Sequence, residues 1–388
     1  MAIELRHHFM GLTGGGLGLL SSMYYLAYAP MQIIVGVMTD RFGPKRVLTF
    51  AILLCVFGTY LFGATSNIYV AACGRFLVGV GSSFAFVGVL KLAAMWLPEK
   101  YFALFTGITT ALGMLGGMIG DVGMTWMVNH LGWHRVISVS IATGMVLIPI
   151  FYFFVHEKII HETARYKNKK TIIAYLKGFF HLLANRDVVI AGLIGCLLYL
   201  SLSAFAEMWG IPFLQRAMPH HKLVASTINS MVFLGWFCGA PLNGWLSGVF
   251  NTRRLLLIVG SLMGAAIFVF ILLSPNLSPL LMGALLFLFG IFSSVQVLCF
   301  AIARDFVTVK LAGTAAGVIN MLVMISGMLL QPIISHMLDW SWSGLVYNGL
   351  RIYSVNDYRI AMLVIPTAYL ISAFLAYIIS EDCHAKIT

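Results

Sequence analysis

Three ionisable side chains lie inside long apolar stretches of this sequence: Arg75, Asp121 and Glu207. A charge held away from water is costly, so such residues usually line a cavity or form a path for ions. A buried carboxylate can also take up and release a proton, which makes Glu207 a candidate proton carrier. For each residue the alternative is a static ion pair or a position at a membrane surface.

Uncharged polar side chains in similar stretches could complete such a pathway. Tyr24, Tyr28 and Gln32 recur every fourth residue, so a helix would carry their polar tips on one face. The amide of Asn320 is a further pathway candidate. For each of these residues the alternative role is an interhelical hydrogen bond, worth about 0.6 kcal/mol.

The elements that position these residues are predicted to be membrane helices. The 388-residue chain is 60% hydrophobic and 10% charged, whereas a soluble domain carries about 25% charged residues. Asp, Glu, Lys and Arg do not occur in 7–39, 47–74, 223–252, 255–303 and 311–338. A membrane-spanning helix needs about 20 mostly apolar residues, and these continuous runs lack the alternation typical of membrane β-strands. The sequence therefore predicts an all-α integral membrane protein.

Eleven spanning helices are predicted when the apolar runs are divided at Gly, Pro, Asn and charged residues. They fall at about 17–38, 47–64, 68–91, 102–128, 135–155, 187–211, 225–248, 255–273, 278–303, 312–338 and 359–380. With the loop at 40–46 in the cytoplasm, 17 Lys and Arg residues lie on the cytoplasmic side and 6 on the outer side. This bias predicts the orientation. The net charge of +11 then reflects topology, and we expect no nucleic-acid partner.

The sequence also contains an internal repeat. Residues 36–46 align with residues 244–254, an offset of 208 at which Gly, Phe and the final Arg are identical. The same offset relates the helix at 102–128 to residues 310–336. Parallel repeats of this kind are typical of membrane transporters built from two helical halves.

The repeat predicts a division of the chain. We expect a helical half at 1–155, a cytoplasmic linker at 156–186 and a second helical half at 187–388. The offset places the counterpart of the helix at 187–211 before residue 1. We therefore expect a twelve-helix arrangement whose first helix is missing, with a true eleven-helix protein as the alternative.

One cytoplasmic loop has a spacing that could serve a gate. It contains Gly36, Asp40, Arg41, Gly43, Lys45 and Arg46. Gly43 permits a tight turn, and Asp40 can accept hydrogen bonds at a neighbouring helix N-terminus. The basic residues can pair with carboxylates or lipid phosphates. Such contacts can form in one conformation and break in another, although the basic residues could simply anchor the topology.

This loop resembles the signature loop of the major facilitator superfamily, and the resemblance extends over essentially the whole chain. The segment from Arg75 through Gly79 and Gly81 is similar to the motif of the fourth helix in that family. The glycines before Asp121 resemble the fifth-helix motif, with Asp121 where Pro often occurs. The resemblance implies a bundle of two pseudo-symmetric halves, and it implies that the signature loop stabilises the outward-facing state.

The resemblance also implies which residues face the central cavity. It makes Arg75 the fourth-helix arginine, which is associated with proton coupling or anionic substrates. The cavity-lining helices would carry Tyr199 and Glu207 in one case and Gln296 in another.

The resulting prediction is a secondary active transporter that works by alternating access. We expect proton-coupled uptake of a small polar metabolite. The single arginine expected in the cavity indicates that this metabolite is anionic or zwitterionic. Proton-coupled efflux is the alternative, but the missing Pro in the fifth helix favours uptake. A membrane enzyme or a non-transporting receptor is the alternative of another class.

The same prediction covers the energy source, cofactors, cellular location and partners of the protein. No GxxxxGK[ST] loop is present, so a gradient would supply the energy. The six cysteines and eleven histidines show no metal-ligand spacing, so we expect no metal, no cofactor and no catalytic residues. We expect the protein in the plasma membrane, specifically a bacterial inner membrane. The expected partners are the substrate, protons and lipid. We expect a monomer.

Overall fold

The computed structural model describes residues 13–96, 99–154, 177–219, 224–250, 252–274, 277–305, 312–347 and 350–379. The first five long helices are α2 (Gly14–Phe42), α3 (Pro44–Gly63), α4 (Ile68–Trp96), α5 (Glu99–Leu131) and α6 (Trp133–Phe154). The later ones include α8 (Arg186–Leu198), η2 (Ser201–Trp209), α9 (Gly210–Ala217), α10 (Ala225–Val249), α11 (Arg254–Leu273), α12 (Pro279–Ser293), η4 (Ser294–Val297) and α13 (Leu298–Asp305). The last are α14 (Ala312–Ile325), η6 (Ser326–Leu330), α15 (Gln331–Trp340), α16 (Val355–Met362) and α17 (Val364–Ile378).

These elements join into a helical segment for each of the eleven predicted helices. The largest difference is at the predicted 187–211, where helical structure continues to Ala217. Two short strands that were not predicted, β1 (Val346–Tyr347) and β2 (Leu350–Arg351), form an antiparallel hairpin. In the predicted linker, residues 177–183 are helical, and 155–176 lie outside the described residues.

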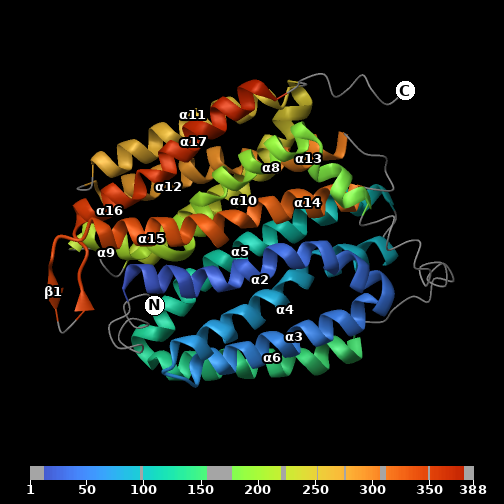
Figure 1. Cartoon of the computed structure of the whole chain (residues 1–388), viewed down its shortest axis with the longest axis horizontal. Coiled ribbons are helices and arrows are strands. Elements are labelled where there is room, and N and C mark those ends of the chain that lie inside the picture. The colour runs from blue at the N-terminus through green and yellow to red at the C-terminus, as the bar shows by residue number, and fades with distance from the viewer. Residues whose placement is uncertain are drawn as a thin grey trace.

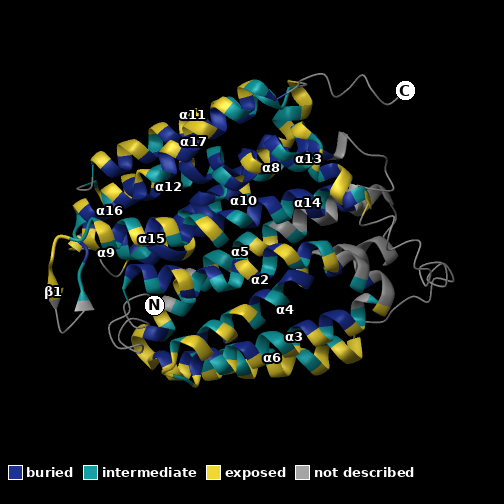
Figure 2. Ribbon diagram, in the orientation of Figure 1, coloured by how far each residue is buried: buried dark blue, intermediate teal, exposed yellow. Residues whose placement is uncertain are grey.

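The helices are suited to lipid rather than to water. Within the described residues, nine helical segments are long and apolar enough to cross a membrane. Two further helices have comparable lengths, with 29 residues in α2 and 25 in α10. Large apolar side chains such as Phe154 and Leu280 are 78% and 86% exposed, and exposed residues recur along the outer helices (Figure 2). Lipid contact accounts for this surface, and the chain is an all-α membrane protein.

The helices form two groups that lie side by side in the ribbon diagram. Helices α2 to α6 lie together, and α8 to α17 lie together (Figure 1). In the first group α4 packs on α2 and α3, and in the second α10 packs on α12. The groups meet where α2 contacts α14 and α15 and where α5 contacts α10. A cavity between the groups is therefore lined by residues far apart in the sequence.

The helix bounds follow the repeat seen in the sequence. Shifted by 208, α2 covers 222–250, against the observed Ala225–Val249 of α10. The same shift places α3 on α11 and α5 on α14 with α15. The register is lost after α15, because the hairpin of β1 and β2 is inserted before α16.

Two π-helical segments, η2 and η6, interrupt the second group next to each other. The Ser203 hydroxyl lies 3.0 Å from that of Ser326, and the Gln331 amide donates to the Ser203 carbonyl. The helix continues past Pro212, and at the end of η2 the Gly210 N–H donates to the Phe205 carbonyl. Segments of this kind are frequent at functional sites.

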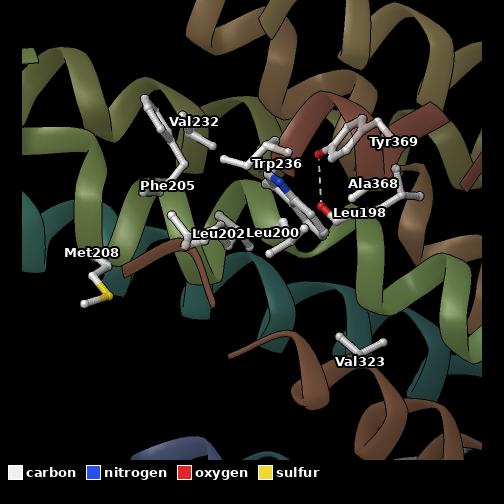
Figure 3. Packing of buried hydrophobic residues seen from close by; sticks show 14 of the residues in the cluster. Leu198, Leu200, Leu202, Phe205, Met208, Val232, Trp236, Val323, Ala368 and Tyr369 are labelled. Carbon is white, nitrogen blue, oxygen red and sulfur yellow. Dashed lines mark hydrogen bonds between the residues drawn. The ribbon is translucent and has the colours of Figure 1, made fainter. Parts of the chain in front are cut away.

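The core of the second group holds η2 in position. Phe205 of η2, Trp236 of α10 and Tyr369 of α17 are all buried there (Figure 3). The Tyr369 hydroxyl donates to the Leu198 carbonyl at 3.0 Å, and the Trp236 indole donates to the Ser201 hydroxyl at 3.2 Å. Hydrogen bonds therefore satisfy polar groups that lipid would leave unpaired.

The contact between α10 and α12 yields a stability prediction. A Cβ added to Gly235 would overlap the Phe287 carbonyl oxygen and lie 2.9 Å from the Gly290 Cα. We expect Gly235→Val to lower the free energy of unfolding by about 1–3 kcal/mol, because the helices would have to separate. The measurement is the melting temperature in detergent. Gly244→Val is the control, because a Cβ there meets nothing within 4 Å. Equal losses in both variants would contradict close packing as the cause.

Candidate functional site

A cavity of about 300 Å³ lies between the two helix groups. Its lining comes from α2 and α4 in the first group and from α8, η2 and α14 in the second. The lining residues are Ser21, Tyr24, Tyr25, Tyr28, Arg75, Tyr199, Glu207 and Met324. Seven of these eight side chains carry a polar group. Polar and ionisable groups that face a cavity inside a membrane bundle usually mark a substrate or ion pathway.

Glu207 is directed into this cavity by η2. The other residues of η2 are buried, whereas Glu207 is exposed. Its accessible surface faces the cavity inside the protein. Its carboxylate accepts a hydrogen bond from the buried Tyr25 hydroxyl of α2. The pair therefore joins the two helix groups across the cavity.

Arg75 reaches the same cavity from α4. Its guanidinium lies over the ring of Tyr24, at 5.4 Å from the centroid, and over that of Phe62, at 5.8 Å. Aromatic faces stabilise a cation in a poorly hydrated site without using its N–H donors. The structure records no ion pair between Arg75 and a described carboxylate, including Glu207, so the guanidinium can accept an anion.

Aromatic residues of α2 form one wall of the cavity. Tyr24 stacks on Tyr28 with centroids 5.7 Å apart and meets Tyr25 edge to face at 5.1 Å. Tyr24 and Tyr28 were predicted as pathway residues, whereas Ser21, Tyr25 and Met324 were not. Ser21 and Tyr25 could have been found, because Ser21, Tyr24, Tyr25 and Tyr28 share one helical face.

The remaining pathway candidates occupy different places. Asn320 lies close enough to Tyr28 for their side chains to interact electrostatically. Gln296 is buried in η4 and does not line the cavity. Gln32, further along α2, donates to the Ser83 carbonyl at 3.4 Å. Asp121 belongs to α5, and its side chain lies outside what the structure describes. The structure thus brings together Arg75, Tyr199 and Glu207, with Asn320 adjacent.

The signature loop lies at the other end of α2. Gly43 joins α2 to α3 with φ 82°, and its N–H donates to the Thr39 carbonyl at 3.1 Å. A side chain would be strained in this conformation. The Lys45 ammonium lies 4.8 Å from the ring centroid of Tyr152, and Arg46 is exposed. The side chains of Asp40 and Arg41 and the surroundings of Gly36 lie outside the described part of the structure, so the gating role stays a prediction.

The family follows from a comparison with known sequences. Residues 2–331 match the model of the Major Facilitator Superfamily. The chain belongs to this family. Within the described residues, no group of three or more His, Cys, Asp and Glu side chains could hold a metal ion.

Relatives within the family include several named proteins. A probable sulfoacetate transporter of Cupriavidus necator is 33% identical over 155 residues, which is 39% of this chain and 36% of the relative. A probable galactarate/D-glucarate transporter of Escherichia coli is 26% identical over 377 residues, which is 89% of this chain and 82% of the relative. The membrane sensor protein UhpC of Salmonella typhimurium is 24% identical over 86% of this chain and 79% of its own.

Solved structures show the same fold. The nucleoside transporter NupG superposes with a TM-score of 0.68 at 13% identity, over 97% of this chain and 93% of its own. A D-xylose-proton symporter gives 0.69 at 15% identity, over 97% and 90%. These relatives and neighbours are named as membrane transporters, apart from the sensor UhpC, and none of them is named as an enzyme.

The contact of Arg75 with Tyr24 yields a second prediction. We expect Tyr24→Leu to destabilise the protein by about 0.5–2 kcal/mol, because the leucine has no aromatic face for the cation. Tyr24→Phe should keep most of the stability, since it keeps the ring. The measurement is thermal unfolding of the purified protein in lipid nanodiscs. A loss in Tyr24→Phe as large as that in Tyr24→Leu would show that the hydroxyl, not the ring, matters.

Proposed function

We propose that this protein is a proton-coupled secondary transporter that takes up a small anionic or zwitterionic metabolite by alternating access. The observation that supports this proposal is that Arg75 and Glu207 line one cavity and form no direct salt bridge, although their charges interact. A resting ion pair would neutralise both groups. Unpaired, one can hold an anion and the other a proton.

Arg75 is the proposed anion site. A guanidinium presents its N–H donors in a planar fork that fits a carboxylate or a sulfonate. Arg75 is the cation that lines the cavity, and the rings of Tyr24 and Phe62 hold it there. The named substrates of two relatives, sulfoacetate and galactarate or D-glucarate, are organic anions, which supports this class of substrate.

Glu207 is the proposed proton site. Ionised, it would repel an anion bound nearby at Arg75, because charges interact strongly where water is scarce. Protonation removes that repulsion, so anion and proton would bind together. Tyr25 donates to the ionised carboxylate and fixes its position between the helix groups. A relative in fold, the D-xylose-proton symporter, is also driven by protons, as its name states.

The cavity volume and polarity restrict the substrate. About 300 Å³ lies at the lower end of the range for small-molecule sites. The hydroxyls of Ser21, Tyr25, Tyr28 and Tyr199 offer hydrogen bonds to a polar body. We therefore infer a compact metabolite with one anionic group at Arg75 and polar groups along α2.

The setting of this activity is part of the proposal. We place the protein in a plasma membrane, as a monomer, with 156–186 in the cytoplasm and no cofactor. The direction is uptake, supported by Asp121 in place of the fifth-helix Pro.

Transport in proteoliposomes tests this function. Sulfoacetate and D-glucarate are the anionic probes and D-xylose is the uncharged one. We expect an inward proton gradient to drive accumulation of an anion but not of xylose. Glu207→Gln should abolish gradient-driven accumulation while anion exchange across the membrane continues, because only the proton site is lost. Arg75→Ala should abolish both.

A matched arginine controls for loss of a cation. The variant Arg135→Ala removes an exposed guanidinium of α6 that does not line the cavity, and we expect it to transport normally. Inhibition by xylose without inhibition by the anions would contradict the role of Arg75. Anion binding without any flux would favour a sensor, the class that the relative UhpC represents.

A further inference from the structure

A carboxylate of the second helix group closes the end of the bundle where α2 begins. Asp339, in α15, accepts hydrogen bonds from the backbone N–H of Gly14 at 2.9 Å and of Gly15 at 2.5 Å. These are the first two residues of α2, where the helix dipole favours an anion and the N–H groups lack partners within the helix. The contact joins residues more than 300 positions apart, in opposite helix groups.

Two side chains from the segment after α15 complete this cluster. The Tyr353 hydroxyl donates to Asp339 and accepts from the Gly14 N–H at 2.8 Å. The Arg351 guanidinium lies 3.5 Å from the same carboxylate and 4.5 Å from the ring centroid of Trp342. The hairpin of β1 and β2 thus lies at the same end of the molecule as the start of α2 (Figure 1).

The backbones of α2 and α15 touch directly beside this cluster. A Cβ added to Gly18 would overlap the Ser335 side chain, and a Cβ at Gly15 would lie 2.6 Å from the His336 ring. Only a helix with glycine at these positions can dock so closely. The contact lies between the cavity and this end of the bundle, since Tyr24 and Tyr25 follow Gly18 by about two turns of α2.

The chemistry of the contact suits a seal that opens. Its bonds are polar and join groups with exposed surface, with side-chain exposures of 37% for Arg351 and 16% for Asp339. Water can replace these partners when the helix groups separate. An apolar seal of the same area would offer no such substitute at the membrane surface. The other end of α2 leads into the signature loop, so one helix runs from this contact to that loop.

We propose that the contact between α2 and α15 is a gate at this end of the bundle, and that Asp339 is its latch. Bound to the N-terminus of α2, it holds this end closed while the cavity opens at the other end, and its release opens the cavity here. The charge bias predicts that this end faces outward. The proposal rests on the alternating access of the proposed function, but it needs no particular substrate or coupling ion.

Cysteine accessibility tests the latch. The reporter is Ser21→Cys in the cavity wall, in a protein whose native cysteines are replaced by Ser. A membrane-impermeant maleimide is applied to vesicles from the side where α2 begins, which Val346→Cys in the exposed hairpin identifies. Asp339→Asn should speed labelling of the reporter several-fold, up to about tenfold, because a charge-assisted bond that holds the closed state is lost.

A second carboxylate at the same end is the matched control. Asp357 accepts hydrogen bonds from the Ser354 N–H at 2.7 Å and the Ser343 hydroxyl at 3.2 Å, and it caps its own helix, α16. Asp357→Asn should leave the labelling rate of the reporter unchanged. Unchanged labelling in Asp339→Asn, or the same increase in both variants, would overturn the latch.

A glycine pair covers the case in which Asp339→Asn does not fold. Gly18→Ala should also speed labelling, because its methyl group separates α2 from α15. Gly113→Ala should not, since a Cβ there meets nothing within 4 Å. Equal labelling in the two glycine variants would contradict the proposal. Because labelling needs no substrate, its outcome is independent of whether anions are transported.

Discussion

The structure depends on the cost of placing polar and charged groups where water is scarce. That cost makes the chain helical, since only helices satisfy the backbone of a lipid-facing segment internally. It also makes each interior polar group informative. Ser203, Trp236 and Tyr369 satisfy backbone or side-chain partners in the second helix group. Arg75 and Glu207 do not pair with each other, and both face the cavity.

The same constraint explains how α2 is used. Its middle lines the cavity with tyrosines, its first residues meet Asp339, and its last residues lead into the signature loop. The tyrosine hydroxyls therefore face the cavity, and the N–H groups at the start of α2 bind a carboxylate. Glycines at Gly15 and Gly18 allow the close approach to α15 that brings the carboxylate to the helix end. One helix therefore connects the binding site to both ends of the bundle.

Much of the fold could be predicted because it depends on local hydrophobicity. Apolar runs gave all eleven helical segments, and the repeat gave the correspondence of α2 with α10. Arg75 and Glu207 could be predicted because ionisable groups are rare at such depth, and Tyr199 was predicted through the resemblance to the family. The sequence missed Tyr25 and Asp339, whose roles depend on which helices meet. It also did not predict the π-helical segments η2 and η6, which contact each other across the second helix group.

The central claim is that an anion at Arg75 and a proton at Glu207 bind together. The most direct measurement is proton uptake by the purified, weakly buffered protein, followed with a pH indicator as sulfoacetate or D-glucarate is added. The account predicts that close to one proton is taken up for each anion bound near neutral pH, and none in Glu207→Gln. Anion binding without proton uptake in the unmodified protein, or equal uptake in Glu207→Gln, would contradict it.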